Sequence, residues 1–439
     1  MNFFNCTVRR SYALKFASAL ACTGVGAGCG GLVLALLLHG IQHVAYGYDT
    51  AHLIGSKTFL EGVSMASPLR RMLVLSTCGL VVGAGWATLY RFGKPLVSIR
   101  RAVASPDPRM PIVSTITHAL LQIITVALGS PLGREVAPRE IGSLLAGRVA
   151  ARAGLSVDDC RLLVACGAGA GLAAVYNVPL GGAVFVLEVL LGTFAPRALL
   201  SAIFTSTIAA VVAWIGLGNE QQYVVPTFHV SAPLMLWAAM CGPMFGLAAW
   251  FFVMLTSGAR ANAPRGTRLL MLSVLNFLLI GVLAGYFPQL AGNGKGAATL
   301  SFDSDLSISL AATLLFLKVA IEASSLRAGA EGGLLTPGLT NGALLGAVLG
   351  GLWNHLMPEV PTGAYALVGA GAFLAASMQM PLTAVALIVE FTHANHDLLF
   401  PLLLAVGGSA VTYRAIPHLV PARLSAKPLT RAALPSSRA

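Results

Sequence analysis

The sequence contains few charged residues. Only 10% of its 439 residues are Asp, Glu, Lys or Arg, whereas soluble domains average about 25%. Acidic residues are the scarcest, with 16 Asp and Glu against 28 Lys and Arg, so the net charge is +12. This shortage argues against an ordinary soluble domain. The 56% of hydrophobic residues and the mean hydropathy of +0.79 instead indicate a polytopic membrane protein.

Motifs for metal binding, disulfide pairing and enzymatic catalysis are also missing. The seven cysteines show no CxxC spacing and no His/Cys ligand spacing, and we interpret them as small core residues. No Ser/His/Asp arrangement is present. His393 and His396 look like an ion-binding pair, but we interpret them as solvated or interfacial. The sequence therefore predicts neither an enzyme, nor a metal, nor a cofactor.

Apolar runs long enough, or nearly so, to cross ~30 Å of hydrocarbon recur along the chain. The N-terminal run has a basic start, as a signal peptide would. It continues past Cys22, however, so we predict an uncleaved first span. The runs include Ala17–Leu38, Met72–Leu89, Leu199–Leu217, Pro233–Leu255 and Leu269–Ala284.

The basic residues lie between apolar runs rather than on one polar domain, so nucleic-acid binding is not expected. Loops rich in Lys and Arg face the cytoplasm in membrane proteins. This rule places both termini and the Arg260–Arg268 loop in the cytoplasm, and the segment 216–233 outside. We expect a multi-pass protein of the inner (cell) membrane, surrounded by the lipid bilayer.

The chain repeats itself. "GAGAGLAAVYNVPLGGAVFVLE" begins at Gly167 and "GAGAFLAASMQMPLTAVALIVE" begins at Gly369, and each ends on an acid, Glu188 and Glu390. This predicts a first repeat at about 17–230, a second at about 231–425 and a short basic cytoplasmic tail at 426–439. Repeats of membrane segments are common in transporters, where the binding site lies between them. The distribution of charge favours an inverted topology.

Two Gly- and Pro-rich segments, "ALGSPLGREVAPREIG" and "SLRAGAEGGLLTPGLTNG", interrupt apolar stretches. Each should end one half-helix and start another, with Pro138 and Pro337 in the first turn of the new helix. A helix N-terminus in a low dielectric offers free N–H groups and partial positive charge, so it binds anions.

Glu135 lies where the half-helix after the first break should begin. Its carboxylate can occupy the anion site itself and compete with a permeating anion, and protonation would release it. The alternative is an ordinary acid that only stabilises a helix dipole. Acids at membrane depth are functional by default, which favours the gate.

These motifs resemble those of the chloride channel/transporter (CLC) family. "GREVAP" is similar to the family's GREGP motif, "GAEGGLLTP" to G(S/A)xGGxxxP, and "AAVYNVPLGGAVFVLE" to A(A)xFNAPLAGxxFxxE. The resemblance implies an all-α membrane protein of about eighteen tilted and broken helices in two inverted-topology repeats, the CLC fold. It also implies a homodimer with one anion pathway per subunit. Too few residues follow Pro421 for a soluble regulatory domain.

The resemblance assigns roles to residues of the two breaks. Glu135 matches the gating glutamate. The backbone amides of Leu334 and Leu335, with Gly333 beside them, match the central anion site, and those of Glu135 and Val136 would serve an outer one. The remaining motif positions are Gly133, Arg134, Pro138, Gly332 and Pro337.

The sequence departs from the family pattern at several positions. The proline of "GREVAP" falls one place late, and no tyrosine matches the family's pore tyrosine. Lys94, or a neighbour, stands where a serine usually touches the anion, and Glu331 adds an acid near the pathway. Val189 replaces the inner glutamate that relays protons, so Glu188 is a possible relay; its alternative role is structural, in bonds to backbone N–H groups.

The function expected from the resemblance is chloride transport, by Cl⁻/H⁺ exchange or proton-gated conduction. Val189 keeps open a passive voltage- or pH-gated channel without proton coupling. Fluoride and nitrate stay open as further anions. A cation-coupled transporter with inverted repeats is a less favoured alternative, because few acids surround Asn177 in its broken segment.

Overall fold

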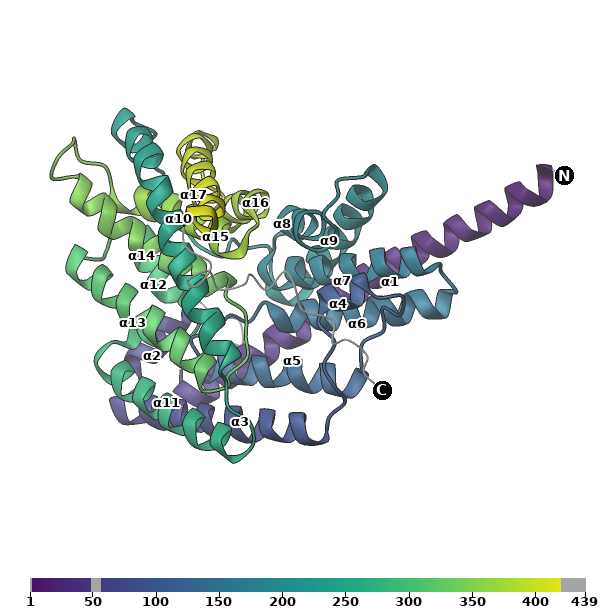
Figure 1. Ribbon diagram of the computed structural model, residues 1–439, viewed down its shortest axis with the longest axis horizontal. Helices are drawn as coiled ribbons and strands as arrows, with labels where there is room; N and C mark the ends of the chain where they lie inside the picture. Colours follow the sequence, from purple (N-terminus) through teal and green to yellow (C-terminus); the bar gives the residue numbers. More distant parts are fainter. Residues whose placement is uncertain (1, 49–56, 420–439) are drawn as a thin grey trace.

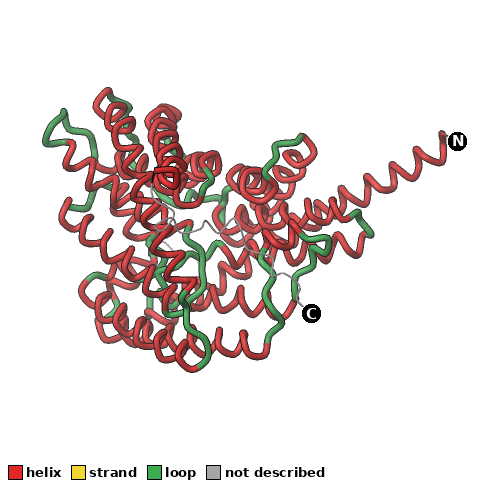
Figure 2. The backbone as a smooth tube through the Cα atoms, viewed as in Figure 1, coloured by secondary structure: helices red, strands yellow, loops and turns green. Residues whose placement is uncertain are grey.

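The computed structural model describes residues 2–48 and 57–419, with side chains from Ser11 onward, so the tail predicted at 426–439 lies outside the described residues. Every regular element in the described ranges is helical (Figure 2), and the only bridge there is isolated, between Gly133 and Gly333. The predicted all-α class is confirmed. Seventeen α-helices stand close to the expected number of about eighteen.

The first half of the chain supplies nine α-helices (Figure 1). The π-helical turn Val186–Leu191 continues the eighth of them. The nine are α1 (Asn2–Tyr46), α2 (Phe59–Met65), α3 (Pro68–Phe92), α4 (Ile99–Ala104), α5 (Ile112–Ala127), α6 (Val136–Ala153), α7 (Val157–Tyr176), α8 (Pro179–Phe185) and α9 (Pro196–Leu217).

The second half supplies eight more α-helices, with 3₁₀ turns at Pro288–Leu290 and His396–Leu398. They are α10 (Ala232–Ala261), α11 (Thr267–Tyr286), α12 (Lys295–Phe302), α13 (Ile308–Arg327), α14 (Leu335–Trp353), α15 (Thr362–Met378), α16 (Pro381–Thr392) and α17 (Leu399–Leu419).

Nine helical segments of the described chain are long and apolar enough to cross a membrane by length and composition. All five apolar runs singled out from the sequence lie inside them, in α1, α3, α9, α10 and α11. Four further apolar helices, including α5 and α16, have only 10–17 residues. The predicted breaks lie between α5 and α6 and between α13 and α14.

The internal repeat is visible in the structure. The α6–α7 pair of the first half packs as the α14–α15 pair of the second half does. Helices α7 and α15 both end at a residue in the left-handed region, Asn177 and Gln379, each with a φ of 55°. The next helices, α8 and α16, both begin with a proline, whose fixed φ suits a first helical position.

The halves join at matching elements, because α3 packs against α11 and α8 against α16. The two repeat acids make the second junction reciprocal. Glu188 accepts hydrogen bonds from the backbone N–H groups of Leu382 and Thr383, at 3.0 and 2.7 Å, at the start of α16. Glu390 accepts from Leu180 and Gly181, at 2.9 and 2.6 Å, at the start of α8. Both carboxylates thus satisfy N–H groups that a helix start leaves unpaired.

Glycines let the repeat helices approach closely. A Cβ added at Gly142 of α6 would overlap the carbonyl oxygen of Gly167 in α7. The second repeat has the same contact between Gly342 of α14 and Gly369 of α15. Close backbone approach at small residues is a main source of helix association in membranes, where lipid is as apolar as the side chains.

We expect Gly142→Ala to lower the thermal stability of the protein in detergent, because the methyl group must separate α6 from α7. Such overpacking costs roughly 1–3 kcal/mol. The matched control is Gly407→Ala in α17, where an added Cβ has no atom within 4 Å. Melting monitored by tryptophan fluorescence checks both, and equal melting temperatures for the two variants would contradict the packing argument.

Candidate functional site

The two interrupted segments meet at an antiparallel bridge between Gly133 and Gly333. The N–H of Gly133 donates to the carbonyl of Gly333 at 2.7 Å, and the reverse bond is 2.9 Å. Helix α6 begins three residues after the first glycine, and α14 begins two residues after the second. The bridge therefore brings together two helix N-termini, whose dipoles both favour negative charge.

The Glu135 side chain lies between these two helix starts and is fully buried, with 0% exposure. Its Oε1 accepts a hydrogen bond from the backbone N–H of Leu335 at 2.7 Å. Its Oε2 lies 3.5 Å from the hydroxyl of Tyr176 at the end of α7. The carboxylate of the first repeat thus occupies the N-terminus of the helix of the second. This is the contact that the gate hypothesis requires.

The residues around Leu335 have two roles: some offer backbone N–H groups at a helix start, and Gly333 leaves space for the Glu135 carboxylate. Leu334 is the N-cap residue of α14, and Glu135 is the N-cap residue of α6, followed by Val136. The expectation that the Gly333 amide binds the anion is corrected by the structure, because this N–H is already bonded to Gly133. A Cβ on Gly333 would instead overlap the Glu135 carboxylate, so glycine is needed here for space.

The shift of the proline in the first motif leaves the start of α6 unchanged. Pro138 is the third residue of α6, and Pro337 is the third residue of α14. The N–H groups of the first helical turn have no intrahelical acceptor, so a proline there costs the helix no hydrogen bond. Gly332, next to the bridge, is also buried, and its carbonyl accepts from Arg260 Nη2 at 2.9 Å.

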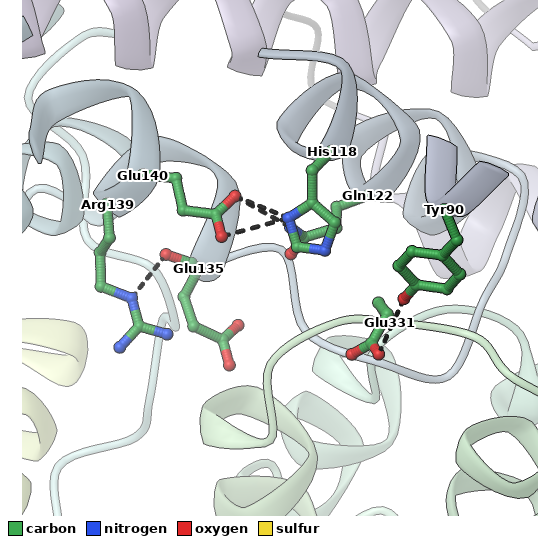
Figure 3. Close-up of polar contacts among 7 residues, drawn as sticks. All are labelled: Tyr90, His118, Gln122, Glu135, Arg139, Glu140 and Glu331. Atoms are coloured by element: carbon green, nitrogen blue, oxygen red, sulfur yellow. Dashed lines mark hydrogen bonds and ion pairs between the residues drawn. The ribbon is translucent and has the colours of Figure 1, made fainter. Parts of the chain in front are cut away.

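Two arginines of the first interrupted segment, Arg134 and Arg139, contact the residues around Glu135. Arg139 donates from Nε to the Glu135 carbonyl at 2.8 Å (Figure 3). Its guanidinium lies 5.1 Å from the Phe185 ring centre. Arg134 lies 5.1 Å from the ring centre of Tyr176. Both arginines therefore support the site from outside the Glu135–Leu335 contact.

The structure adds site residues that sequence reasoning missed. The Tyr176 hydroxyl lies 3.0 Å from Thr336 Oγ1 as well as near Glu135. Edge-to-face contacts join Tyr176 to Phe391, and Phe391 to Tyr223. The signal was available, because an aromatic residue directly precedes Asn177 in the repeat.

On one side of the tips, cations gather around these aromatic rings. The Lys295 ammonium lies 5.7 Å from the ring centre of Tyr223, and Arg134 lies over Tyr176. The same side carries the loop of Asn219 and Glu220, which holds the Asn177 amide. This loop belongs to the segment that the charge rule places outside the cell.

Glu331 lies on the other side of the tips, beside Gly332. Its Oε2 is 3.8 Å from Arg260 Nε, and its Oε1 accepts from the hydroxyl of Tyr90 at 3.3 Å (Figure 3). Arg260 belongs to the loop that the charge rule places in the cytoplasm. The extra acid predicted near the pathway thus lies beside the bridge, on the side of Arg260.

Lys94 is not brought to the Glu135–Leu335 contact. It is exposed in the loop between α3 and α4 and lines a cavity of about 720 Å³ together with Tyr90, Arg91 and Arg265. The expectation that it replaces the serine at the anion is therefore corrected: the loop places this lysine in a cavity beside Tyr90, which also contacts Glu331.

The Glu188–Val189 pair supplies no proton acceptor to the pathway. Glu188 is bonded to the start of α16, including the hydroxyl of Thr383 at 2.6 Å, and Val189 packs against the main hydrophobic core. The structural interpretation of Glu188 describes this geometry better than a relay does.

The described residues contain no cluster of three or more His, Cys, Asp or Glu side chains that could hold a metal ion. Asn177, considered for a cation site, instead accepts from the Trp214 indole at 2.7 Å and donates to Asn219 at 2.9 Å. Its amide is thus used to fix the α7–α8 turn against α9.

Two helix starts that face one buried carboxylate, inside a bundle of apolar helices, define a multi-pass membrane protein with its site between two repeats. The family model described as voltage gated chloride channel matches residues 78–414. The chain belongs to this family.

A ClcB-like chloride channel protein of Ralstonia nicotianae is 32% identical over 385 residues, which covers 83% of this chain and 87% of the relative. An H⁺/Cl⁻ exchange transporter, ClcA, of Vibrio parahaemolyticus is 30% identical over 65% of this chain and 64% of the relative. The crystal structure of a slow cyanobacterial Cl⁻/H⁺ antiporter superposes with a TM-score of 0.77 at 19% identity, over 92% of this chain and 95% of that chain. This likeness confirms the CLC fold.

We expect Glu135→Gln to tighten chloride binding, because the neutral side chain competes less well for the Leu335 N–H. A gain of roughly tenfold in Kd corresponds to ~1.4 kcal/mol. Isothermal titration calorimetry in detergent measures it. The matched control is Glu322→Gln, another fully buried acid, whose carboxylate accepts from Asn341 at 2.8 Å. An unchanged Kd in Glu135→Gln would contradict the competition.

Proposed function

We propose that the protein transports chloride across the cell membrane along a pathway that passes the tips of α6 and α14, with Glu135 as its gate. One observation carries this proposal: a buried carboxylate already occupies the N–H of Leu335, at 2.7 Å. A group of donors that binds an internal anion will bind a permeating one when the internal anion leaves.

Gating follows from competition for the same donors. The ionised Glu135 carboxylate and a chloride ion repel each other in the buried site, where charges interact more strongly than in water. When Glu135 takes up a proton, it loses its charge and most of its preference for the helix N-terminus. Chloride can then occupy the backbone amides of Leu334 and Leu335, while those of Glu135 and Val136 serve the outer position.

We favour Cl⁻/H⁺ exchange over a passive channel for this chain. The related ClcA protein and the structurally similar cyanobacterial protein are described as exchangers of these two ions. A carboxylate that alternates between holding a proton and yielding to chloride links the two ions at one residue. The passive channel remains the second candidate because Val189 cannot carry a proton.

Charge supports the orientation in this proposal. The basic Arg260–Arg268 loop faces the cytoplasm, with both termini on the same side. Lys94, Arg91 and Arg265 then line the cytoplasmic mouth, where their charge attracts anions. Arg134 and Lys295 have the same effect at the outer mouth.

The proposal includes a homodimer. The reciprocal caps of Glu188 and Glu390 lie beside exposed Leu180 and Leu382, with 51% and 54% exposure. Polar groups at helix starts are poorly accommodated against lipid. A second copy packed on α8 and α16 would cover these starts, and the remaining apolar surface would contact the lipid bilayer.

Reconstituted protein should pass chloride in preference to Na⁺ or K⁺. The measurement is chloride efflux from proteoliposomes with a chloride electrode, repeated with each cation in turn and with fluoride and nitrate in place of chloride. A flux that requires one particular cation would favour the cation-coupled alternative and overturn the anion assignment.

Chloride flux should rise as the pH falls, because protonation neutralises Glu135 and releases the Leu335 N–H. In Glu135→Gln the flux should be high and should lose this pH dependence. Glu322→Gln is the control and should keep the wild-type profile. A Glu135→Gln profile that follows the wild type across pH 4 to 8 (the range over which carboxyl and imidazole groups titrate, roughly) would remove Glu135 as the gate.

Size-exclusion chromatography with light scattering in mild detergent should give a protein mass of twice 45.3 kDa. A monomeric mass under conditions that preserve chloride transport would contradict the homodimer and leave the transport proposal intact.

A further inference from the structure

A second buried acid lies near the gate and is paired with a histidine. Glu140 of α6 and His118 of α5 are each only 8% exposed. The Nδ1 atom of His118 lies 2.9 Å from Oε2 and 3.1 Å from Oε1 of Glu140. The Gln122 amide donates to the same Oε2 at 3.3 Å. This group is not part of the mechanism described so far.

Figure 3 shows the pair in the same region as Glu135 on one hand and the Tyr90–Glu331 contact on the other. Glu140 is on the same helix as Glu135, five residues further along. The second ring nitrogen of His118, away from Glu140, is turned toward the side of Tyr90 and Glu331 in this view. The pair is therefore near two further acids, Glu135 at the start of its own helix and Glu331 beside the bridge.

The partners of Glu140 distinguish it from Glu188 and Glu390, the half-buried acids of the repeats. Those two carboxylates bind backbone N–H groups of helix starts. Glu140 instead faces an imidazole, the side chain that most readily gains and loses a proton near neutral pH. A buried ion pair is weak evidence for stability, since apolar residues of similar volume often serve as well. The chemistry of the pair points to proton binding.

Two charged groups of other elements lie near the pair: Glu331, in the segment before α14, and Arg260 of α10. Arg139 of α6 is directed to the Glu135 carbonyl rather than to Glu140. Trp86 of α3 also contacts the pair, with its ring edge-on to the imidazole at 6.2 Å between centroids.

We propose that the His118–Glu140 pair is the inner proton-binding site of the protein, in place of the relay acid that Val189 lacks. This inference rests on the proposed Cl⁻/H⁺ exchange. The pair gains one proton from water on the Glu331 side and shares it along the Nδ1–Oε2 hydrogen bond. It then releases that proton to the Glu135 carboxylate, where one O–H bond forms as the one at the pair breaks.

The final transfer crosses a gap that no hydrogen bond between described residues spans. A water molecule, or a turn of the Glu135 carboxylate away from Leu335, completes it. Chloride at the Leu335 N–H favours that turn, because it displaces the carboxylate from the donor. Proton delivery and chloride binding then depend on each other.

The test measures proton uptake driven by a chloride gradient, together with chloride flux, in the same proteoliposomes. In Glu140→Gln we expect the ratio of proton to chloride flux to fall by about tenfold or more, the loss typical of removing one proton-transfer group. Chloride flux itself should persist. Glu140→Asp should recover part of the ratio, and the buried control Glu322→Gln should keep the wild-type value.

His118→Asn is the second variant. It tests the inference in the case that Glu140→Gln does not fold. Its side-chain amide keeps a hydrogen-bond donor toward Glu140 but cannot take up a proton. A wild-type flux ratio in either folded variant overturns the inference. A merely structural pair would lower both fluxes together and leave their ratio unchanged, which also overturns it.

The outcome for the wild-type protein separates this inference from the proposed function. If the wild type moves chloride without any proton uptake, the exchange proposal fails, and the proton site fails with it. If the wild type couples the two ions and the variants couple them equally well, only the proton site fails.

Discussion

The hydrogen bond between the Glu135 carboxylate and the Leu335 N–H is the contact on which the site depends. It links the first repeat to the second, and it exists only because the Gly133–Gly333 bridge holds the two helix starts opposite each other. Gly333 has no side chain that would fill the space of the carboxylate. A buried charge is costly unless it has donors, and here a helix start supplies them. A small anion that offers the same charge can take its place.

The repeat explains why the structure contains such junctions at all. Two halves related by an inverted repeat put equivalent helix starts face to face, as the α8 and α16 starts also show. Where the partner is Glu188 or Glu390, an acid from the opposite half closes the junction with two backbone hydrogen bonds. At the α6 and α14 starts, one acid is present on one side only, with a single backbone donor. This asymmetry supports the proposal that Glu135 is the acid that moves.

The sequence predicted the elements whose signals are local. The apolar runs, the repeat at Gly167 and Gly369 and the start of a helix after Glu135 all follow from composition and spacing, and the structure contains each of them. The residues that tertiary contacts decide were not predicted. Tyr176 reaches the gate only because α7 packs on α6, and Lys94 lies in the cavity beside Tyr90 because its loop leaves the bundle. The sequence assigned the Gly333 amide to an anion because neither of the two segments, read alone, indicates the bridge to Gly133.

A valine at position 189 does not exclude a proton relay elsewhere in the chain. A proton relay is defined by which groups reach the gate in space, whereas the motif records only one position in the π-helical turn that follows α8. The side chain of Glu188 beside it is committed to the start of α16, so an acid in that segment is not free to carry protons. Helix α7 separates Glu140 from the Glu188–Val189 segment in sequence. Glu140 nevertheless lies in α6, the helix that Glu135 caps, and has a titratable partner in His118. In an apolar chain with so few acids, what each carboxylate contacts is a better guide to its task than the motif in which it stands.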